Sequence, residues 1–276
     1  MLLLYAKLFP RFYFQTFYIA ILTDIKQNIL NCDFNKQFVM NIRILTFNIH
    51  KGIGWGRTPT LDKIHSHIQE LHPDIIFLQE IRGSQFEEIS SEIWPHLSYG
   101  KNAIYRSGHH GNAILSKFPI LLSDNIDLTL RHYERRGLLH SIIKFGSFEQ
   151  TLHLLCVHLG LSIRDQLKQL KKIVTYIQST LSDQDLLILG GDFNDWTGSA
   201  TKPLIKGLGL QEAFLHCHQA YARTFPAWAP LLKLDRVYYR GFHASCAHRL
   251  LQHPWRILSD HIALEAHLTL KNVNEQ

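Results

Sequence analysis

Apolar runs and helical repeats alternate along the chain from about residue 40 onward. Hydrophobic residues recur every three or four positions from Leu61 to Leu71, which predicts an amphipathic helix with Thr60 as its N-cap. A second helix is expected over 163–181 and a short one around 86–93. Short apolar runs predict buried strands at 42–47, 75–78, 112–116, 138–144, 152–158, 186–189, 237–239 and 262–268. Since no linker-like segment interrupts this alternation, we predict one α/β domain over residues 40–276.

Residues 1–39 have a different character from the rest of the chain. They are rich in aromatic and aliphatic residues, but the long uncharged stretch from Phe12 to Leu22 has only about 11 residues. That stretch is short for a membrane span, which needs roughly 20 residues. Met40 stands directly before the first predicted strand. One hypothesis is therefore that Met40 is the natural start and that 1–39 is a mis-assigned extension; the alternative is a weak membrane anchor.

Composition narrows the class of protein further. The 276 residues are 46% hydrophobic and 19% charged, which is typical of a globular domain. A net charge of +6 suits a polyanionic partner such as nucleic acid, or an anionic membrane surface. The cysteines (Cys32, Cys156, Cys217 and Cys246) lack C-x-x-C spacing, which argues against a zinc site or a disulfide framework. We expect a cytoplasmic location, or alternatively a peripheral one at the inner face of the membrane, and predict no protein partner.

Polar side chains follow several of the predicted strands. Asn48, Glu80, His158 and Asp192 each come at most two residues after an apolar run. A single Asn or Glu in such a place is usually a turn or cap residue. Several such residues at the same ends of buried strands are expected to converge, and their oxygen and imidazole groups suit a hard cation and an activated water.

The segment G-G-D-F-N-D (190–195) contains two glycines that would allow a sharp turn and a close approach to a ligand. In an extended segment, Asp192 and Asn194 would point to the same side and could orient a water beside a phosphate. The alternative interpretation is a turn built on Asx side chains.

A second acidic and imidazole pair lies near the C-terminus, in S-D-H (259–261). Asp260 could bind a metal ion while His261 faces a phosphate. Asp235, in L-D-R-V, is a candidate to hold His261 in one tautomer, although a surface salt bridge is the simpler interpretation of that motif alone.

Taken together, seven short motifs resemble those of the endonuclease/exonuclease/phosphatase superfamily, which includes deoxyribonuclease-like metal-dependent phosphodiesterases. The motifs are T-F-N, L-Q-E, G-N-A-I-L-S, H-L, G-D-F-N, L-D-R-V and S-D-H. The resemblance covers residues 41–268 and is strongest to small bacterial members. It implies a four-layer α/β sandwich, in which two facing mixed, mostly antiparallel sheets are flanked by helices.

The resemblance also implies roles for individual residues. It implies Mg²⁺ as the cofactor, with Mn²⁺ expected to substitute. The residues that match metal-binding positions are Asn48, Glu80 and Asp260, and those that match catalytic positions are His158, Asp192, Asn194, Asp235 and His261. Arg136 and Asn112 are the candidates for substrate binding, with Arg135 an equal contender for the arginine.

The expected activity is Mg²⁺-dependent phosphoester hydrolysis by in-line attack of water. A nuclease or related phosphodiesterase is the first hypothesis, and it predicts a basic groove formed by Arg57, Arg106, Arg136 and Arg223. The alternative is a phospholipid or glycolipid headgroup phosphodiesterase or phosphatase acting at a membrane. It predicts an apolar rim from the loops 55–57 and 223–230, with possible membrane association through 1–39. The adjacent His109 and His110 would either line a phosphate pocket or lie in a partly exposed loop with one histidine hydrogen-bonded.

Overall fold

The fold is taken from a computed structural model that describes residues 40–89, 92–106, 108–131, 134–145, 150–198 and 201–271. The hypotheses about residues 1–39 fall outside this part of the chain. Within the described residues, no helix combines the length and the hydropathy that a membrane crossing requires.

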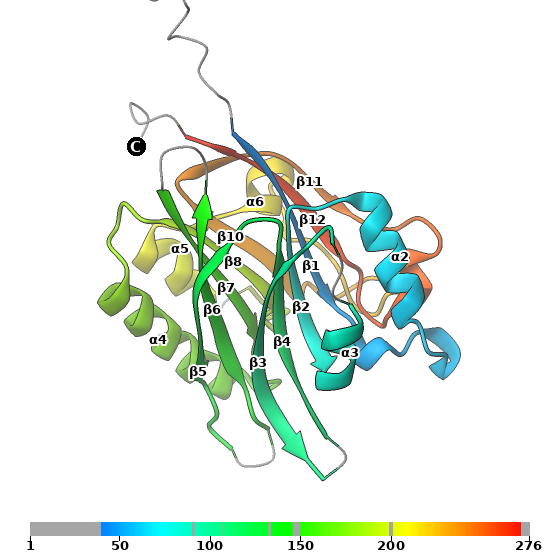
Figure 1. The fold of residues 1–276 in the computed structure, drawn as a ribbon. Helices are drawn as coiled ribbons and strands as arrows, with labels where there is room; N and C mark the ends of the chain where they lie inside the picture. Colours follow the sequence, from blue (N-terminus) through cyan, green and yellow to red (C-terminus); the bar gives the residue numbers. More distant parts are fainter. Residues whose placement is uncertain are drawn as a thin grey trace, which may run out of the picture. The chain divides into compact units, whose positions relative to one another are not determined.

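The described strands form two six-stranded sheets (Figure 1). In the first sheet the order is β11 (Phe242–Arg249), β12 (Leu264–Leu270), β1 (Asn41–Asn48), β2 (Ile75–Arg82), β4 (Gly108–Ser116) and β3 (His96–Tyr105). In the second it is β5 (Ile120–Asp127), β6 (Gly137–Phe145), β7 (Gln150–His158), β8 (Leu186–Asp192), β10 (Asp235–Arg240) and β9 (Gln211–Glu212). Each sheet has a single parallel pair, β1 with β2 and β7 with β8, while its other neighbours are antiparallel.

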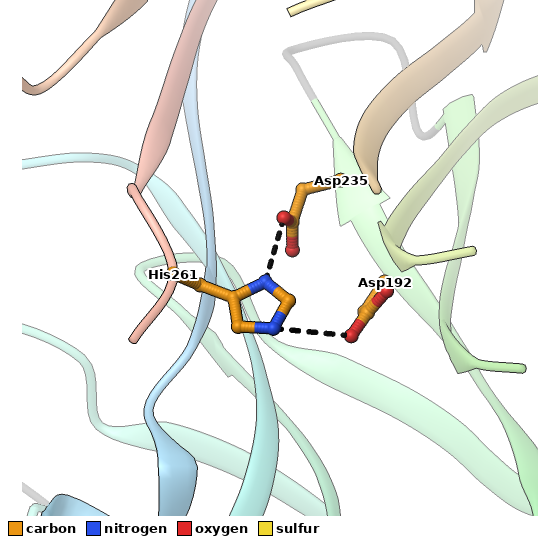
Figure 2. Close-up of side chains that lie close together, drawn as sticks. All are labelled: Asp192, Asp235 and His261. Carbon is orange, nitrogen blue, oxygen red and sulfur yellow. Dashed lines mark hydrogen bonds and ion pairs between the residues drawn. The ribbon is translucent and has the colours of Figure 1, made fainter. Parts of the chain in front are cut away.

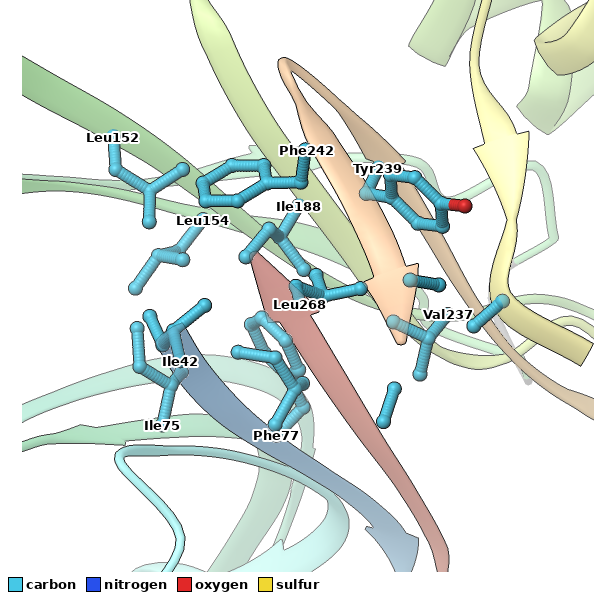
Figure 3. Packing of buried hydrophobic residues seen from close by; sticks show 14 of the residues in the cluster. Ile42, Ile75, Phe77, Leu152, Leu154, Ile188, Val237, Tyr239, Phe242 and Leu268 are labelled. Carbon is cyan, nitrogen blue, oxygen red and sulfur yellow. The ribbon is translucent and has the colours of Figure 1, made fainter. Parts of the chain in front are cut away.

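The sheets face each other across the main hydrophobic core. Figure 3 shows Ile42, Ile75 and Phe77 of the first sheet opposite Leu152, Leu154 and Ile188 of the second, all of them buried. Two further clusters lie on the outer faces of the sheets. The fold is therefore the predicted four-layer sandwich of two mixed sheets and flanking helices.

Helices cover both outer faces (Figure 1). On the first sheet, α2 (Leu61–Leu71) and α7 (Trp255–Leu258) contribute to one outer cluster, and α3 (Gly83–Glu88) contributes Phe86 to the same cluster. On the second sheet, α4 (Ile163–Thr180) and α5 (Lys202–Leu208) supply the other. The remaining helices are α6 (Ala213–His218) and the short 3-10 turns η1 (His50–Gly52) and η2 (Trp55–Arg57).

The strands that the sequence did not predict are the edges of the two sheets. These are β3, β11, β5 and β9, each of which has a neighbour on one side only. An edge strand is only partly covered, and most of β5 is exposed. A half-covered strand needs no continuous apolar run, so the pattern that reveals the inner strands is missing there.

Local details also differ from the prediction. The expected helix at 86–93 begins earlier, at Gly83, and ends at Glu88. Thr60 precedes α2 as predicted, but its hydroxyl does not cap the helix and instead donates to the carbonyl of Leu258. That bond joins the start of α2 to the end of α7.

Gly190 serves the packing between the sheets. It lies inside β8, and a Cβ built on it would lie 2.6 Å from Cδ2 of Phe77 in the facing sheet. The aromatic ring therefore occupies the space that a side chain would need. The expectation that this glycine makes room for a ligand is replaced by a role in the core.

We predict that Gly190→Ala lowers the free energy of unfolding by about 1–3 kcal/mol, the usual cost of overpacking a core. Gly207→Ala is the matched control, because nothing lies within 4 Å of the Cβ position of this exposed residue of α5. That control is expected to stabilise the protein by up to about 1 kcal/mol, since alanine favours a helix interior. Urea titration of both variants measures the difference, and equal stabilities would contradict the assignment of Gly190.

Candidate active site

The parallel pair at the centre of each sheet directs four strand ends to one place. Strands β1 and β2 end near Asn48 and Glu80, and β7 and β8 end at His158 and Asp192, which lie side by side in register. Strand β10 runs antiparallel to β8 and begins at Asp235, opposite Asp192. The end of one sheet therefore faces the end of the other, and their polar side chains meet.

Asp192 lies at the centre of this cluster and is buried. Its Oδ2 accepts a hydrogen bond from Nδ2 of Asn48 at 3.0 Å, and its Oδ1 accepts one from the backbone N–H of Asn194 at 2.9 Å. The Nε2 atoms of His158 and His261 lie 3.5 and 3.7 Å from the same Oδ2. Burial raises the pKa of Asp192 to about 6, against the lowering effect of the His261 charge. The carboxylate is therefore ionised at neutral pH and close to the pKa that suits a general base.

His261 is held between two carboxylates (Figure 2). Its Nδ1 lies 2.9 Å from Oδ2 of Asp235, while its Nε2 faces Asp192. Burial alone would lower the pKa of His261, but the carboxylates of Asp235 and Asp192 raise it to about 10. At neutral pH the ring is an imidazolium, which is the form that can donate to a phosphoryl oxygen.

His158 differs from His261 in its protonation, although both rings contact the carboxylate of Asp192. Burial, together with the positive charge of Arg136, lowers the pKa of His158 well below its usual value. The ring is therefore neutral at physiological pH. Two carboxylates of the site lie near this ring. Oδ2 of Asp192 is 3.5 Å from Nε2 of His158, and the charge of Glu80 opposes the lowering of the His158 pKa.

Glu80 lies at the opposite edge of the cluster. A shift of register between Leu78 and Ile81 places Glu80 in the left-handed region, with φ 58°. Its Oε2 lies 2.8 Å from Nζ of Lys51. Burial alone would raise the pKa of Glu80. The charge that His158 acquires in acidic solution, together with the hydrogen bond and the charge of Lys51, lowers that pKa to about 2. Glu80 thus carries a full negative charge at any working pH.

The residues around Glu80 suit a divalent cation. Asn48 directs Oδ1 toward the backbone N–H of His50 at 3.1 Å, and the half-exposed Asp260 lies 3.6 Å from Nδ1 of His50. Oxygen donors with a permanent negative charge are what Mg²⁺ requires. By contrast, Asp192, Asp235 and His261 also present ligand atoms within 4.8 Å of one another, but the Asp235–His261 hydrogen bond already occupies the imidazole Nδ1. The assignment of Glu80, Asn48 and Asp260 as metal ligands stays a prediction.

Two predicted site residues are oriented by the backbone around them. Asn194 is not extended as expected: its φ is 51° and its Nδ2 donates to the carbonyl of Leu159 at 2.9 Å. The Nδ2 of Asn112 donates to the carbonyls of Gly137 and Cys156, so Asn112 ties the two sheets together and has only its Oδ1 left to offer.

Arg136, the arginine predicted to contact phosphate, acts on His158, one of the two histidines at Asp192. Arg136 pairs with Glu134 at 3.0 Å and lowers the pKa of His158 through its charge. Its Nε is buried and finds no hydrogen-bond partner among the described residues. Arg135 is exposed and lines the same recess as Arg136, so the two remain neighbours at one rim of the site.

Two different rims flank the site. On one side the lining of a recess of about 550 Å³ includes Lys101, Arg131, Arg135 and Arg136, and the carboxylate of Asp127. On the other side the lining of a smaller recess of about 310 Å³ includes Trp55, Phe225 and Trp228, together with Arg57, Arg256 and Asp260.

The four arginines predicted to form one groove are distributed differently. Arg136 lines the basic recess, Arg57 the aromatic one, and Arg223 a third recess next to Arg249. Arg106 is exposed at the end of the β3–β4 hairpin. The predicted groove is therefore not formed by these four residues as a set.

Sequence reasoning did not assign a role to His50 or Lys51. Both have positive φ values, 46° and 59°, in the turn that follows β1. They bring an imidazole to Asp260 and an ammonium to Glu80. The only available signal was their place in T-F-N-I-H-K-G, directly after Asn48.

Comparison with known proteins places this geometry in a family. Residues 45–261 match the model of the Endonuclease/Exonuclease/phosphatase family. The chain is 36% identical over 254 residues to uncharacterized protein YbhP of Escherichia coli, a match that covers 86% of this chain and 99% of that protein. YbhP of Shigella flexneri matches to the same extent.

Solved structures share the fold. An endonuclease/exonuclease/phosphatase from Beutenbergia cavernae superimposes with a TM-score of 0.73 at 19% identity, covering 84% of this chain and 72% of that one. TDP2 of Caenorhabditis elegans superimposes with a TM-score of 0.67 at 17% identity, covering 83% and 74%. The chain belongs to the endonuclease/exonuclease/phosphatase family and is an enzyme that hydrolyses phosphoester bonds.

Proposed function

We propose that this protein is a Mg²⁺-dependent nuclease or closely related phosphodiesterase that cleaves by in-line attack of water. The observation that carries the proposal is the buried Asp192 carboxylate, which Asn48 and Asn194 hold while a neutral and a charged histidine flank it. This arrangement supplies a base for water and cationic donors for a phosphate within one cluster.

The residues of the site have different roles in this mechanism. Asp192 orients a water and takes its proton, since its pKa lies near the working pH. His261, kept protonated by Asp235, donates from Nε2 to a phosphoryl oxygen, and Arg136 offers its unpartnered Nε to the same charge. Glu80, with Asn48 and Asp260, would hold Mg²⁺. When bound, the ion supplies Lewis-acid stabilisation of the phosphate and the leaving oxygen.

The basic recess favours a nucleic acid as the substrate. Lys101, Arg131, Arg135 and Arg136 gather on the side of the site where Arg136 acts on His158. A polyanionic strand gains affinity from such a surface, and the gain weakens steeply with salt.

A second candidate function rests on the aromatic rim. Trp55 and Trp228 are 62% and 60% exposed, and their rings contact edge-on with centroids 6.4 Å apart. Phe225 lies beneath this rim with its ring centroid 5.1 Å from that of His261. Exposed tryptophans next to a reacting phosphate would suit a lipid headgroup phosphodiesterase that works at a membrane interface.

We predict that Asp192→Asn reduces kcat on a cleaved phosphodiester by at least about 10²-fold, because the general base is lost while the shape of the side chain is kept. Plasmid DNA, single-stranded RNA and phospholipid vesicles are incubated with Mg²⁺ and either the wild type or the variant. Nicking or RNA cleavage by the wild type alone supports the nuclease. Headgroup release with intact nucleic acid would select the second candidate, and equal activity of the two proteins would remove Asp192 from the mechanism.

The pH profile of kcat/KM should have an acidic limb near 6, where Asp192 takes up a proton, and an alkaline limb near 10, where His261 loses one. Asp235→Asn removes a carboxylate that stabilises the imidazolium, so the alkaline limb should move down by at least about one pH unit toward the ordinary histidine value. The fully exposed Asp183 supplies the control variant Asp183→Asn, whose profile should match the wild type. An alkaline limb that stays in place in Asp235→Asn would exclude a charged His261 from catalysis.

Glu80→Gln should raise the Mg²⁺ concentration that gives half-maximal activity by at least about tenfold, since it removes the charged oxygen donor. The exposed Glu70 of α2 supplies the control Glu70→Gln, which makes the same change of charge outside the site. The measurement is activity against Mg²⁺ concentration for the three proteins. Superimposable curves would show that Glu80 does not bind the ion.

A further inference from the structure

Another polar recess opens beside Glu80, and the mechanism described above does not use it. Its volume is about 520 Å³, and its lining includes Lys51, Arg82, Ser84, Tyr105, His109 and His110. Among the described residues that line it, none carries a carboxylate. The recess therefore presents several hydrogen-bond donors and cationic groups to solvent.

Contacts within the protein fix the two histidines of this recess. His109 Nδ1 lies 2.9 Å from the hydroxyl of Tyr99, and its ring packs on Gly83, where an added Cβ would lie 2.1 Å from Cε1. The ring of His110 is stacked with that of Tyr105 at a centroid distance of 5.7 Å. Both histidines belong to strand β4 and not to a loop, but they are half-buried and His109 is hydrogen-bonded, as the second alternative expected.

The recess shares a wall with the catalytic cluster. Lys51 lines the recess and at the same time places its ammonium 2.8 Å from Oε2 of Glu80. Strand pairing sets His110 opposite Arg82, two residues beyond Glu80. The charges of Lys51, Glu80 and Arg136 all act on the pKa of His110, which burial lowers, and the charge of His110 acts in turn on His158.

We propose that this recess binds a second phosphate group of the substrate, adjacent along the strand to the phosphate that is cleaved. This inference rests on the proposed nuclease function and specifies its substrate class. One phosphate, held by His261 and by an ion on Glu80, would leave this recess with Lys51, Arg82 and His110 without a bound anion. A strand with a phosphate at each nucleotide supplies the second anion, and the exposed guanidinium of Arg82 suits bidentate binding to it.

Two chromogenic esters that differ by one phosphate test the proposal. They are the p-nitrophenyl ester of thymidine 5′-phosphate and the same ester with an additional 3′-phosphate. The wild type should favour the second ester in kcat/KM by about tenfold, as expected for one set of charge-assisted hydrogen bonds. Arg82→Gln should reduce this ratio to near one, and Arg164→Gln, an equal charge change on the exposed face of α4, should keep it.

The ratio is measured within each protein, so a general loss of activity in Arg82→Gln does not imitate the expected result. A ratio near one in the wild type, or an unchanged ratio in Arg82→Gln, would overturn the subsite. If the wild type hydrolysed neither ester, the proposed function would fail instead.

A binding measurement separates the subsite from hydrolysis. Calorimetry with the Asp192→Asn protein compares thymidine 3′,5′-bisphosphate with thymidine 5′-phosphate, and equal affinities would overturn the subsite whatever the activity. The same comparison is made between phosphatidylinositol 4-phosphate and phosphatidylinositol. If only this pair shows a preference that depends on Arg82, the ligand of the recess is not a nucleic acid strand.

Discussion

One buried carboxylate, that of Asp192, has to be satisfied from both sheets at once. Removing an anion from water costs several kcal/mol unless hydrogen bonds and opposite charges replace the lost solvent. Asn48 provides one bond from the first sheet, the N–H of Asn194 provides another from the chain after β8, and the charge of His261 offsets the rest. The anion is therefore stable only while the two sheets keep their present distance.

Several other contacts between the sheets also fix that distance. Asn112 of β4 donates to carbonyls of the opposite sheet, and the amide of Gln79 lies 3.3 Å from Sγ of Cys156. Gly190 admits the ring of Phe77 two residues before Asp192. Core packing and the position of the proposed general base therefore depend on each other, since a change of spacing at Gly190 would also move the Asp192 carboxylate away from Asn48.

The part of this site that could be predicted from sequence follows from strand direction. Asn48, Glu80, His158 and Asp192 come after apolar runs, and the parallel pairs bring the ends of those runs together. Lys51 and Arg82 could not be found in that way, because their positions depend on left-handed backbone at Lys51 and Glu80 and on a register shift in β2. The edge strands were missed for a related reason, since half-covered strands carry no continuous apolar run.

The two histidines on Asp192 show how position alone sets chemical role. Both are buried, and both place Nε2 within 3.7 Å of the same oxygen. Asp235 behind His261 raises the pKa of that ring and keeps it charged. Burial and the charge of Arg136 lower the pKa of His158 and keep that ring neutral, against the opposing charge of Glu80. A phosphate entering between them would meet a fixed donor on one side and, on the other, a ring able to accept or donate a hydrogen bond. The asymmetry comes from the neighbours that each strand supplies, so β10, which brings Asp235, is as necessary to the proposed mechanism as the strand that ends at the base.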